Sequence, residues 1–340
     1  MKLSTLLLSS AALVVAGSAY AADLPAKKGA PAAKPAATGC PAFGAGFFQI
    51  PGGDTCISFS GFARYEGKFV SSTSAMTQVG KGRLVADVRS NSDVGVVRGV
   101  VRVNVAATAG TASSDRAYVA LGGFTAGAYG SSADIAPSAT NNIDYQLGYD
   151  PSATGMKYSM PLGSTTVTVA AEEATNTNSY TAKNPDLLLK VSTSIAGASV
   201  DLVGASHQNS AGQGYAFLAA GKFAGGPATF GIWGGTSQGA VTYTGAQSTT
   251  NATYDVVSGS MTTGTAFGGS VAFAAGNGTL GLDAVQSNVS VSGTTYSTTA
   301  YGVQYALAVA KGLTVTPEFQ YSSVEGTASN TTYLRIQRDF

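Results

Sequence analysis

The stretch LTVTPEFQY at residues 313–321 decides the fold class of this chain. Leu313, Val315, Pro317, Phe319 and Tyr321 occupy every second position, and Thr, Glu and Gln fill the positions between them. Successive side chains of a β-strand point to opposite faces, so this order gives the strand one apolar face and one polar face. Such a strand fits between a lipid phase and water.

The same alternation recurs from Ile57 to the C-terminus, and helical periodicity is nearly absent. Residues 301–309 alternate Tyr, Val and Leu with Gly, Gln and Ala, and residues 166–172 also alternate. A soluble antiparallel sandwich shows this period too, so the period alone does not place the chain in a membrane.

Three further features favour a transmembrane barrel. The chain ends on a strand, 333–340, where Leu334, Ile336 and Phe340 share one face, and a terminal Phe340 is typical of the assembly signal of outer-membrane barrels. The polar face of the C-terminal half consists of Ala, Gly, Ser and Thr, which suits a wide lumen. Short links alternate with long polar segments, as periplasmic turns and outer loops do in such barrels. The short links are 91–93, 122–123, 276–278 and 311–312, and the long segments are 71–80, 131–149, 174–186, 236–260 and 324–330.

The sequence therefore predicts an all-β fold, a transmembrane antiparallel β-barrel of about 16 strands with both ends in the periplasm. A barrel of this size is too wide for side chains to fill, so water occupies its interior and the barrel becomes a conduit. Trp233 and the Tyr and Phe residues near strand ends are predicted to form interfacial girdles, with a sugar-stacking platform as an alternative.

The N-terminal segment is predicted to direct export. A charged start, an apolar stretch from Leu6 to Val15 and small residues up to Ala21 follow the order of a secretory signal peptide. The Pro/Ala/Lys tract that follows has almost no bulky apolar side chain and predicts a disordered leader. The expected organisation is a signal peptide over 1–21, a periplasmic leader with a short disulfide loop over 22–56, and the barrel over 57–340.

Cys40 and Cys56 are the two cysteines of the chain. Export places them in an oxidising compartment, where a single pair normally bonds, so we expect a disulfide between them. A metal-binding pair is the disfavoured alternative, since no histidine, aspartate or second cysteine pair stands at ligand spacing.

Composition and motifs argue against other classes of function. Charged residues make up 11% of the chain and the formal net charge is +1, so nucleic acid is not an expected partner. His207, the only histidine, falls in a predicted outer loop as an exposed residue. Glu172 and Glu173 are neighbours on a strand and point to opposite faces, which disfavours paired acid/base chemistry. Since no phosphate-binding loop or metal-ligand pattern is present, we expect no enzyme, no cofactor and no metal site.

Several motifs resemble the alphaproteobacterial general porins. The segment CPAFGAGFFQIPGGDTC at 40–56 is followed by GFARY at 61–65, and the likeness continues through GRL at 82–84, VVRV at 100–103 and DRAYVALGGFTAG at 115–127. The resemblance implies about 16 strands, a homotrimer, and a third outer loop folded into the lumen. That loop corresponds here to 131–149, which lacks the aromatic and acidic run typical of the family.

Strand parity predicts which charged side chains line the lumen. A charged side chain facing hydrocarbon near the midplane costs about 2–4 kcal/mol, so arginines on these strands are expected to face water. Five arginines and one aspartate, Asp87, fall on inward positions and form a predicted basic wall of the pore constriction. The arginines are Arg83, Arg89, Arg98, Arg102 and Arg116.

Asp134 and Asp144 lie in the segment expected to fold inward. Opposite the basic wall they would create a transverse field that orients dipolar solutes and biases ion flow. The alternative is that the arginines form a hydrated inter-strand ladder and the two aspartates cap loop turns. We expect weak anion preference or little selectivity.

These features together predict a general porin, a multi-pass β-barrel of the bacterial outer membrane. Ions and small hydrophilic solutes would diffuse through it passively. Outer-membrane lipids, these solutes and further copies of the chain in a homotrimer are the expected partners. The main alternative is a substrate-selective outer-membrane channel, and a β-barrel adhesin or surface receptor is a less favoured one.

Overall fold

The computed structural model describes residues 39–135, 152–174, 184–244, 255–257 and 259–340. These residues belong to the compact unit Thr38–Phe340. The predicted signal peptide and residues 22–38 of the predicted leader lie outside the described residues, so both stay predictions. Among the described residues, no helix has the length and hydropathy needed to cross a membrane.

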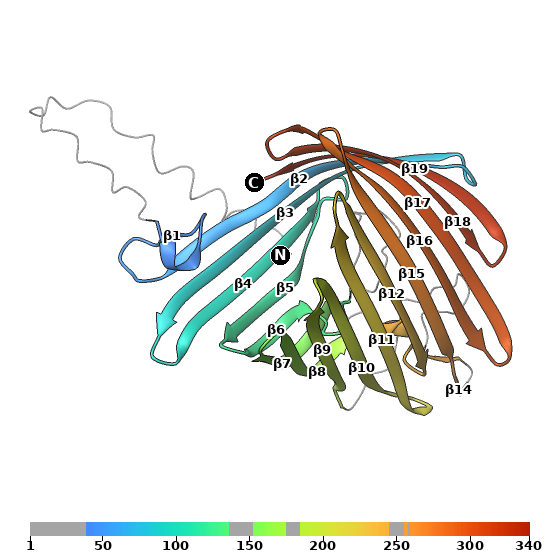
Figure 1. Ribbon diagram of the computed structural model, residues 1–340, viewed down its shortest axis with the longest axis horizontal. Helices are drawn as coiled ribbons and strands as arrows, with labels where there is room; N and C mark the ends of the chain where they lie inside the picture. Colours follow the sequence, from blue (N-terminus) through green and yellow to red (C-terminus); the bar gives the residue numbers. More distant parts are fainter. Residues whose placement is uncertain (1–38, 136–151, 175–183, 245–254, 258) are drawn as a thin grey trace, which may run out of the picture. The chain divides into compact units, whose positions relative to one another are not determined.

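The described residues form a closed antiparallel β-barrel (Figure 1). Neighbouring strands pair in sequence order, and the last strand pairs with the first, with Ile336 opposite Tyr65, so the sheet has no open edge. Within the described ranges the barrel has sixteen strands, which confirms the predicted fold class. They are β2 (Cys56–Val70), β3 (Ala75–Ser92), β4 (Gly95–Ala106), β5 (Thr111–Leu121), β6 (Phe124–Gly130), β7 (Ser152–Leu162), β8 (Thr165–Ala174), β9 (Asp186–Ile195), β10 (Ala198–Asn209), β11 (Gly212–Gly225), β12 (Ala228–Gln238), β15 (Thr263–Ala275), β16 (Gly278–Val291), β17 (Thr294–Ala310), β18 (Leu313–Val324) and β19 (Thr327–Asp339).

A disulfide joins Cys40 and Cys56, as predicted. It closes the segment that precedes the barrel, in which Phe48 pairs with Ile57 at the start of β2. The short elements outside the barrel wall are η1 (Pro41–Phe43), β1 (Phe48–Gln49), η2 (Val241–Tyr243), β13 (Val256–Val257) and β14 (Ser260–Met261).

Side chains alternate between the two faces of the wall, as residues 313–321 predict. In β18, Phe319 is 43% exposed on the outer face, whereas Glu318 and Gln320 on either side of it are 3% exposed. Outward apolar residues recur on the other strands, among them Leu202 and Phe217. The outer face is therefore apolar where lipid would lie, and polar residues such as Glu318 and Gln320 face the lumen.

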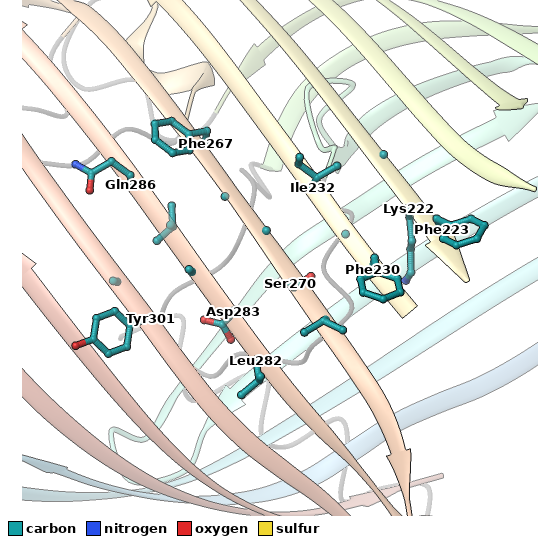
Figure 2. A pocket seen from close by; sticks show the side chains of 18 of the residues that line it. Lys222, Phe223, Phe230, Ile232, Phe267, Ser270, Leu282, Asp283, Gln286 and Tyr301 are labelled. Carbon is teal, nitrogen blue, oxygen red and sulfur yellow. The ribbon is translucent and has the colours of Figure 1, made fainter. Parts of the chain in front are cut away.

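Figure 2 shows this outer face over β11, β12 and β15–β17. Phe230, Ile232, Phe267, Leu282 and Tyr301 are exposed there, and a groove of about 1010 Å³ lies among them. The wall in this region is apolar, as contact with hydrocarbon requires.

The connections differ between the two ends of the barrel. At the end that holds Cys56 and Phe340 they are two-residue turns, for example at 122–123. At the opposite end the longest are 131–151 and 239–262, which we name the third and the sixth outer segments. This asymmetry agrees with periplasmic turns at one end and outer loops at the other.

Two of the predicted long outer segments are mostly strand. β3 begins at Ala75, inside the predicted segment 71–80, and β18 is joined to β19 by Glu325 and Gly326 alone. These two residues have φ values of 52° and 83°, the left-handed pair that a two-residue hairpin turn requires. Polar composition misled the prediction, because the outer ends of these strands carry polar residues on both faces.

A β-bulge interrupts the ladder between β4 and β5. Arg102 lies opposite Arg116, whereas the next residue, Val103, lies opposite Ser114, so Asp115 is an extra residue on β5. A bulge breaks the alternation of side chains, so the neighbours Asp115 and Arg116 can both point to the inner face.

Candidate pore lining

The five arginines of the predicted basic wall lie on the inner face of three neighbouring strands. β3 carries Arg83 and Arg89, β4 carries Arg98 and Arg102, and β5 carries Arg116. The register places Arg98 opposite Arg89 and Arg116 opposite Arg102, so four of the guanidinium groups form two adjacent rows.

A cavity of about 840 Å³ lies against this wall and touches all of these arginines except Arg83. Tyr118 and Lys157 line it as well, and the Arg98 guanidinium carbon lies 5.8 Å from the centre of the Tyr118 ring. Arg83 lies to one side, where its Nε donates to Asn104 Oδ1 at 2.8 Å. The cavity therefore combines cationic and aromatic surfaces.

Two aspartates face these arginines, where the sequence predicts one. Asp87 accepts hydrogen bonds from Arg89 and Arg98, and the Nη2 atom of each lies 2.8 Å from Asp87 Oδ2. Asp115 accepts from Arg102, whose Nε lies 2.6 Å from Asp115 Oδ1. Asp115 was missed because the bulge changes its parity. The wall consequently carries less net positive charge than the predicted five arginines and one aspartate would give.

A second charged group extends the wall onto β2 and β19, and sequence analysis did not single it out. Glu66 is its centre: Arg64 Nη1 lies 3.1 Å and Arg335 Nη2 lies 3.2 Å from Glu66 Oε1, and Lys81 pairs with the other oxygen. The sequence could have indicated this group, because Lys81 and Arg83 are two positions apart on one strand and their side chains therefore point to the same face. Cations outnumber carboxylates in this group too.

The third outer segment begins by turning into the lumen. The Ser131 hydroxyl and the Ser132 N–H donate to the buried carboxylate of Glu172 on β8, the latter at 3.2 Å. Ile135 is also buried, within a cluster of apolar inner-wall residues. Glu173, the neighbour of Glu172, is exposed, so these two carboxylates point to opposite faces as predicted.

The structure describes Asp134 but not Asp144, the two loop acids of the predicted constriction. The backbone carbonyl of Asp134 accepts from Lys190 Nζ at 2.6 Å, and Lys190 in turn lies 3.6 Å from the carboxylate of Asp201 on β10. Asp134 is thus bound to the side of the barrel formed by β9 and β10. Asp144 lies outside the described residues, so the acidic side of the constriction stays a prediction.

His207 is not the exposed loop residue that the sequence predicts. It lies on the inner face of β10 and is 4% exposed. Its Nδ1 is 2.8 Å from Oδ1 of Asp186, and its Nε2 is 3.4 Å from Oδ2 of Asp255. The prediction is wrong because the turn after β10 spans only 210–211, so the strand continues through His207. In the part of the chain that the structure describes, no group of histidine, cysteine and acidic residues is arranged to hold a metal ion.

Trp233 lies inside the barrel and not at a membrane interface. It is buried on β12, while the preceding residue, Ile232, is exposed on the outer face. Trp233 belongs to the same buried apolar cluster as Leu218 and Ala266. The girdle prediction is therefore wrong for this residue, because its position along β12 turns it inward.

Comparison with known proteins decides the family of this barrel. A family model described as the porin subfamily matches residues 30–338, which is most of the chain. The chain belongs to the porin subfamily. The resemblance that rests on motifs such as 40–56 is thereby confirmed, and this porin is an outer-membrane β-barrel protein.

Two relatives align with parts of this porin. An outer membrane protein of Sinorhizobium fredii is 31% identical over 150 residues, which cover 37% of this chain and 42% of the relative. The porin Omp2a of Brucella ovis is 46% identical over 69 residues, which cover 20% of each protein. The chain therefore aligns with less than half of the length of either relative.

Solved structures share the fold of this porin. The outer membrane channel DcaP of Acinetobacter baumannii has a TM-score of 0.75 at 15% identity, over 86% of this chain and 99% of DcaP. The trimer form of OmpT, an outer membrane protein of Vibrio cholerae, has a TM-score of 0.64 at 13% identity, over 85% of this chain and all of OmpT. At such identities the likeness supports the barrel fold alone.

Phe340 completes the seam of this porin's barrel. Its N–H and its carbonyl pair with the carbonyl and the N–H of Gly61 on β2, at 3.1 and 3.0 Å. The Phe340 side chain is exposed, at the junction of the first and last strands. Its role as an assembly signal stays a prediction.

Proposed function

We propose that this porin forms a water-filled channel through which ions and small hydrophilic solutes diffuse passively across the outer membrane, with a weak preference for anions. One observation carries the proposal: on the inner faces of β2–β5 and β19, arginines and lysines outnumber the carboxylates that pair with them. Fixed charges along a low-dielectric wall raise the local concentration of counter-ions, so anions would enter more readily.

The preference would be weak because much of the charge is compensated. Asp87 neutralises part of the charge of Arg89 and Arg98, and Asp115 does the same for Arg102. The remaining cations act on solutes through lumen water. Such a wall biases flow and leaves the channel open to many solutes.

A substrate-selective channel is the second candidate, and the cavity over the basic wall favours it. Arg98 and Arg116 stand beside Tyr118 there, so one surface offers both cationic and aromatic contacts to a solute. Current block would separate the two candidates. A selective channel would be blocked in a saturable way by one anionic solute, whereas a general channel would show conductance proportional to salt concentration.

The family and fold are those of channels and not of enzymes.

The proposal extends to a homotrimer. Support comes from the family and from a structural neighbour that is a trimer. Native electrophoresis of the purified protein in detergent would show a species of three chains that heat converts to the monomer. A monomer at every temperature would exclude this part of the proposal.

Planar-bilayer recording of the double variant Arg98→Ala/Arg102→Ala tests the function. We expect the pore to survive, the conductance to stay similar or rise, and the anion preference, read from the zero-current potential in a salt gradient, to fall. Arg338→Ala on the outer face of β19 is the matched control and should change none of these. Unchanged selectivity in the double variant would rule out the basic wall as its source.

A further inference from the structure

The sixth outer segment follows β12, and the structure describes its residues 239–244, 255–257 and 259–262. Among its described residues, Ala240, Val241 and Tyr243 are almost completely buried. Their partners are inner-wall residues of the apolar cluster, including Trp233. Part of this segment therefore lies on the inner wall, in addition to the start of the third outer segment.

The wall under the segment is built from small residues. A Cβ atom at Gly264 on β15 would lie 3.2 Å from Val241 Cγ1 and 3.0 Å from the Thr244 hydroxyl. A Cβ atom at Gly214 on β11 would lie 2.1 Å from the carbonyl oxygen of Gly239. A larger residue at Gly214 would displace the segment, so the close approach of backbone to wall depends on glycine there, whereas the contacts at Gly264 are with side chains that can shift slightly.

A charged cluster fastens the segment to the wall. His207 of β10 stands between Asp186, at the start of β9, and Asp255 of the segment. The Tyr243 hydroxyl donates a hydrogen bond to Asp186, and the Thr242 N–H donates one to Asp255 at 3.2 Å. A carboxylate only accepts hydrogen bonds, so contact with one on each ring nitrogen favours the doubly protonated, cationic imidazole. His207 then holds two acids, one from the wall and one from the segment.

The segment lies across the barrel from the basic wall. In the closed strand order, β12 and β4 are separated by β5 to β11 in one direction and by β15 to β19 with β2 and β3 in the other, so equal numbers of strands lie between them. Material held against β12 and β15 therefore narrows the lumen from the side opposite Arg98 and Arg102.

We propose that His207 determines the size limit of the channel by holding residues 239–244 and 255–257 of the sixth outer segment against the inner wall. This inference rests on the proposed function, since it concerns the width of a conducting lumen. Without the imidazole, Asp186 and Asp255 would repel each other across the contact, and the segment would leave the wall. His207 acts here as a positioning residue: it sets the lumen through the segment and need not touch the solute.

Single-channel conductance and the exclusion of neutral polyethylene glycols of graded size test the proposal. Leaving the wall would free the segment to move, so His207→Ala is expected to change the conductance by roughly 1.5-fold and to shift the polymer size limit, with frequent current fluctuations. Asp255→Asn removes the same contact from the segment side and should change the conductance and the size limit in the same sense as His207→Ala. If His207→Ala does not fold, Asp255→Asn tests the proposal in its place. Glu173→Gln, an exposed carboxylate on the outer face of β8, is the control and should match the wild type.

A disulfide lock makes the test specific to the segment. The Cβ position at Gly264 lies 3.0 Å from the Thr244 side-chain oxygen, so the pair Gly264→Cys/Thr244→Cys is placed for a cross-link. In the His207→Ala background the oxidised pair should restore the wild-type conductance and size limit, and reductant should abolish the rescue. Reduced wild type controls for the native Cys40–Cys56 disulfide.

The outcomes separate this inference from the proposed function. A wild-type protein that forms no channel would overturn the function and the inference together. A conducting wild type, with a folded His207→Ala or Asp255→Asn variant that shows the same conductance and size limit as the wild type, would overturn the inference alone. A locked variant that fails to restore these values would also overturn it.

Discussion

Asp87 sets how much positive charge the channel wall presents, because it accepts hydrogen bonds from both Arg89 and Arg98. Asp87→Asn keeps the shape of the side chain and removes one negative charge, so we expect a stronger anion preference in zero-current potential measurements. Asp93→Asn, in an exposed periplasmic turn, should leave the potential unchanged. A channel that becomes less anion-selective on loss of Asp87 would contradict its place in the conducting lumen.

Glu172 holds the start of the third outer segment through Ser131 and Ser132. Hydrogen bonds to a charged group contribute about 1.5–3 kcal/mol each, and Glu172→Gln weakens them while keeping the volume. We expect more frequent substates in the open-channel current, measured at constant voltage. Glu173→Gln serves as the outward-facing control, and an equally quiet record from both variants would speak against this anchor.

Sequence reasoning placed individual residues well where strands are regular. The inward position of Arg98 and Arg102 follows from alternation alone, because the valines beside them must face lipid. Alternation failed at Asp115, where a bulge adds a residue, and at His207, where a two-residue turn replaces an expected loop. Both errors come from local backbone features that leave no mark in the hydrophobic period.

At the scale of elements, the disulfide-closed segment before β2 contributes only the two residues of β1 to the sheet, and the closed ladder of sixteen strands does not depend on it. The bond joins residues 16 positions apart, and loss of a cross-link of this length costs about 3 kcal/mol in the chain-entropy account. In Cys40→Ser/Cys56→Ser we expect faster protease cleavage within 41–55 and an unchanged barrel, measured by limited proteolysis with mass spectrometry. Loss of heat-resistant barrel in this variant would show that the barrel depends on the disulfide-closed segment.

The outer segments were the elements least accessible to sequence reasoning. Polar composition marks them as loops, yet it does not distinguish a tight turn such as 325–326 from a segment that enters the lumen. The buried position of Val241 and Tyr243 depends on contacts with glycines and alanines on distant strands. Such contacts exist only once the barrel has closed.

At the scale of the whole molecule, the pairing of β19 with β2 closes the sheet into a barrel, and Phe340 is the last residue of β19's side of that pairing. Phe340→Ala keeps the main-chain hydrogen bonds to Gly61, so the finished channel should conduct normally. We expect a lower yield of heat-modifiable barrel in the outer membrane, measured by semi-native electrophoresis. Ile336→Ala removes an apolar side chain from the same face of β19, and an equal loss in this control would argue against a signal at Phe340.

The strand number and the family could be predicted because both rest on patterns spread over the chain. The content of the lumen could not, because it depends on where the outer segments return inside the closed barrel. The sequence accordingly indicated a conduit with a basic wall and left the opposite wall, with His207 and the sixth outer segment, undetermined.

A barrel that encloses water beside a wall with an excess of positive charge should conduct ions and favour anions. Recording the wild-type protein in a planar bilayer under a salt gradient measures both properties at once. We expect stepwise, ohmic conductance and a zero-current potential of the sign that anion preference produces. A membrane that stays electrically silent would exclude the water-filled lumen, and a potential of the opposite sign would exclude the excess of positive charge.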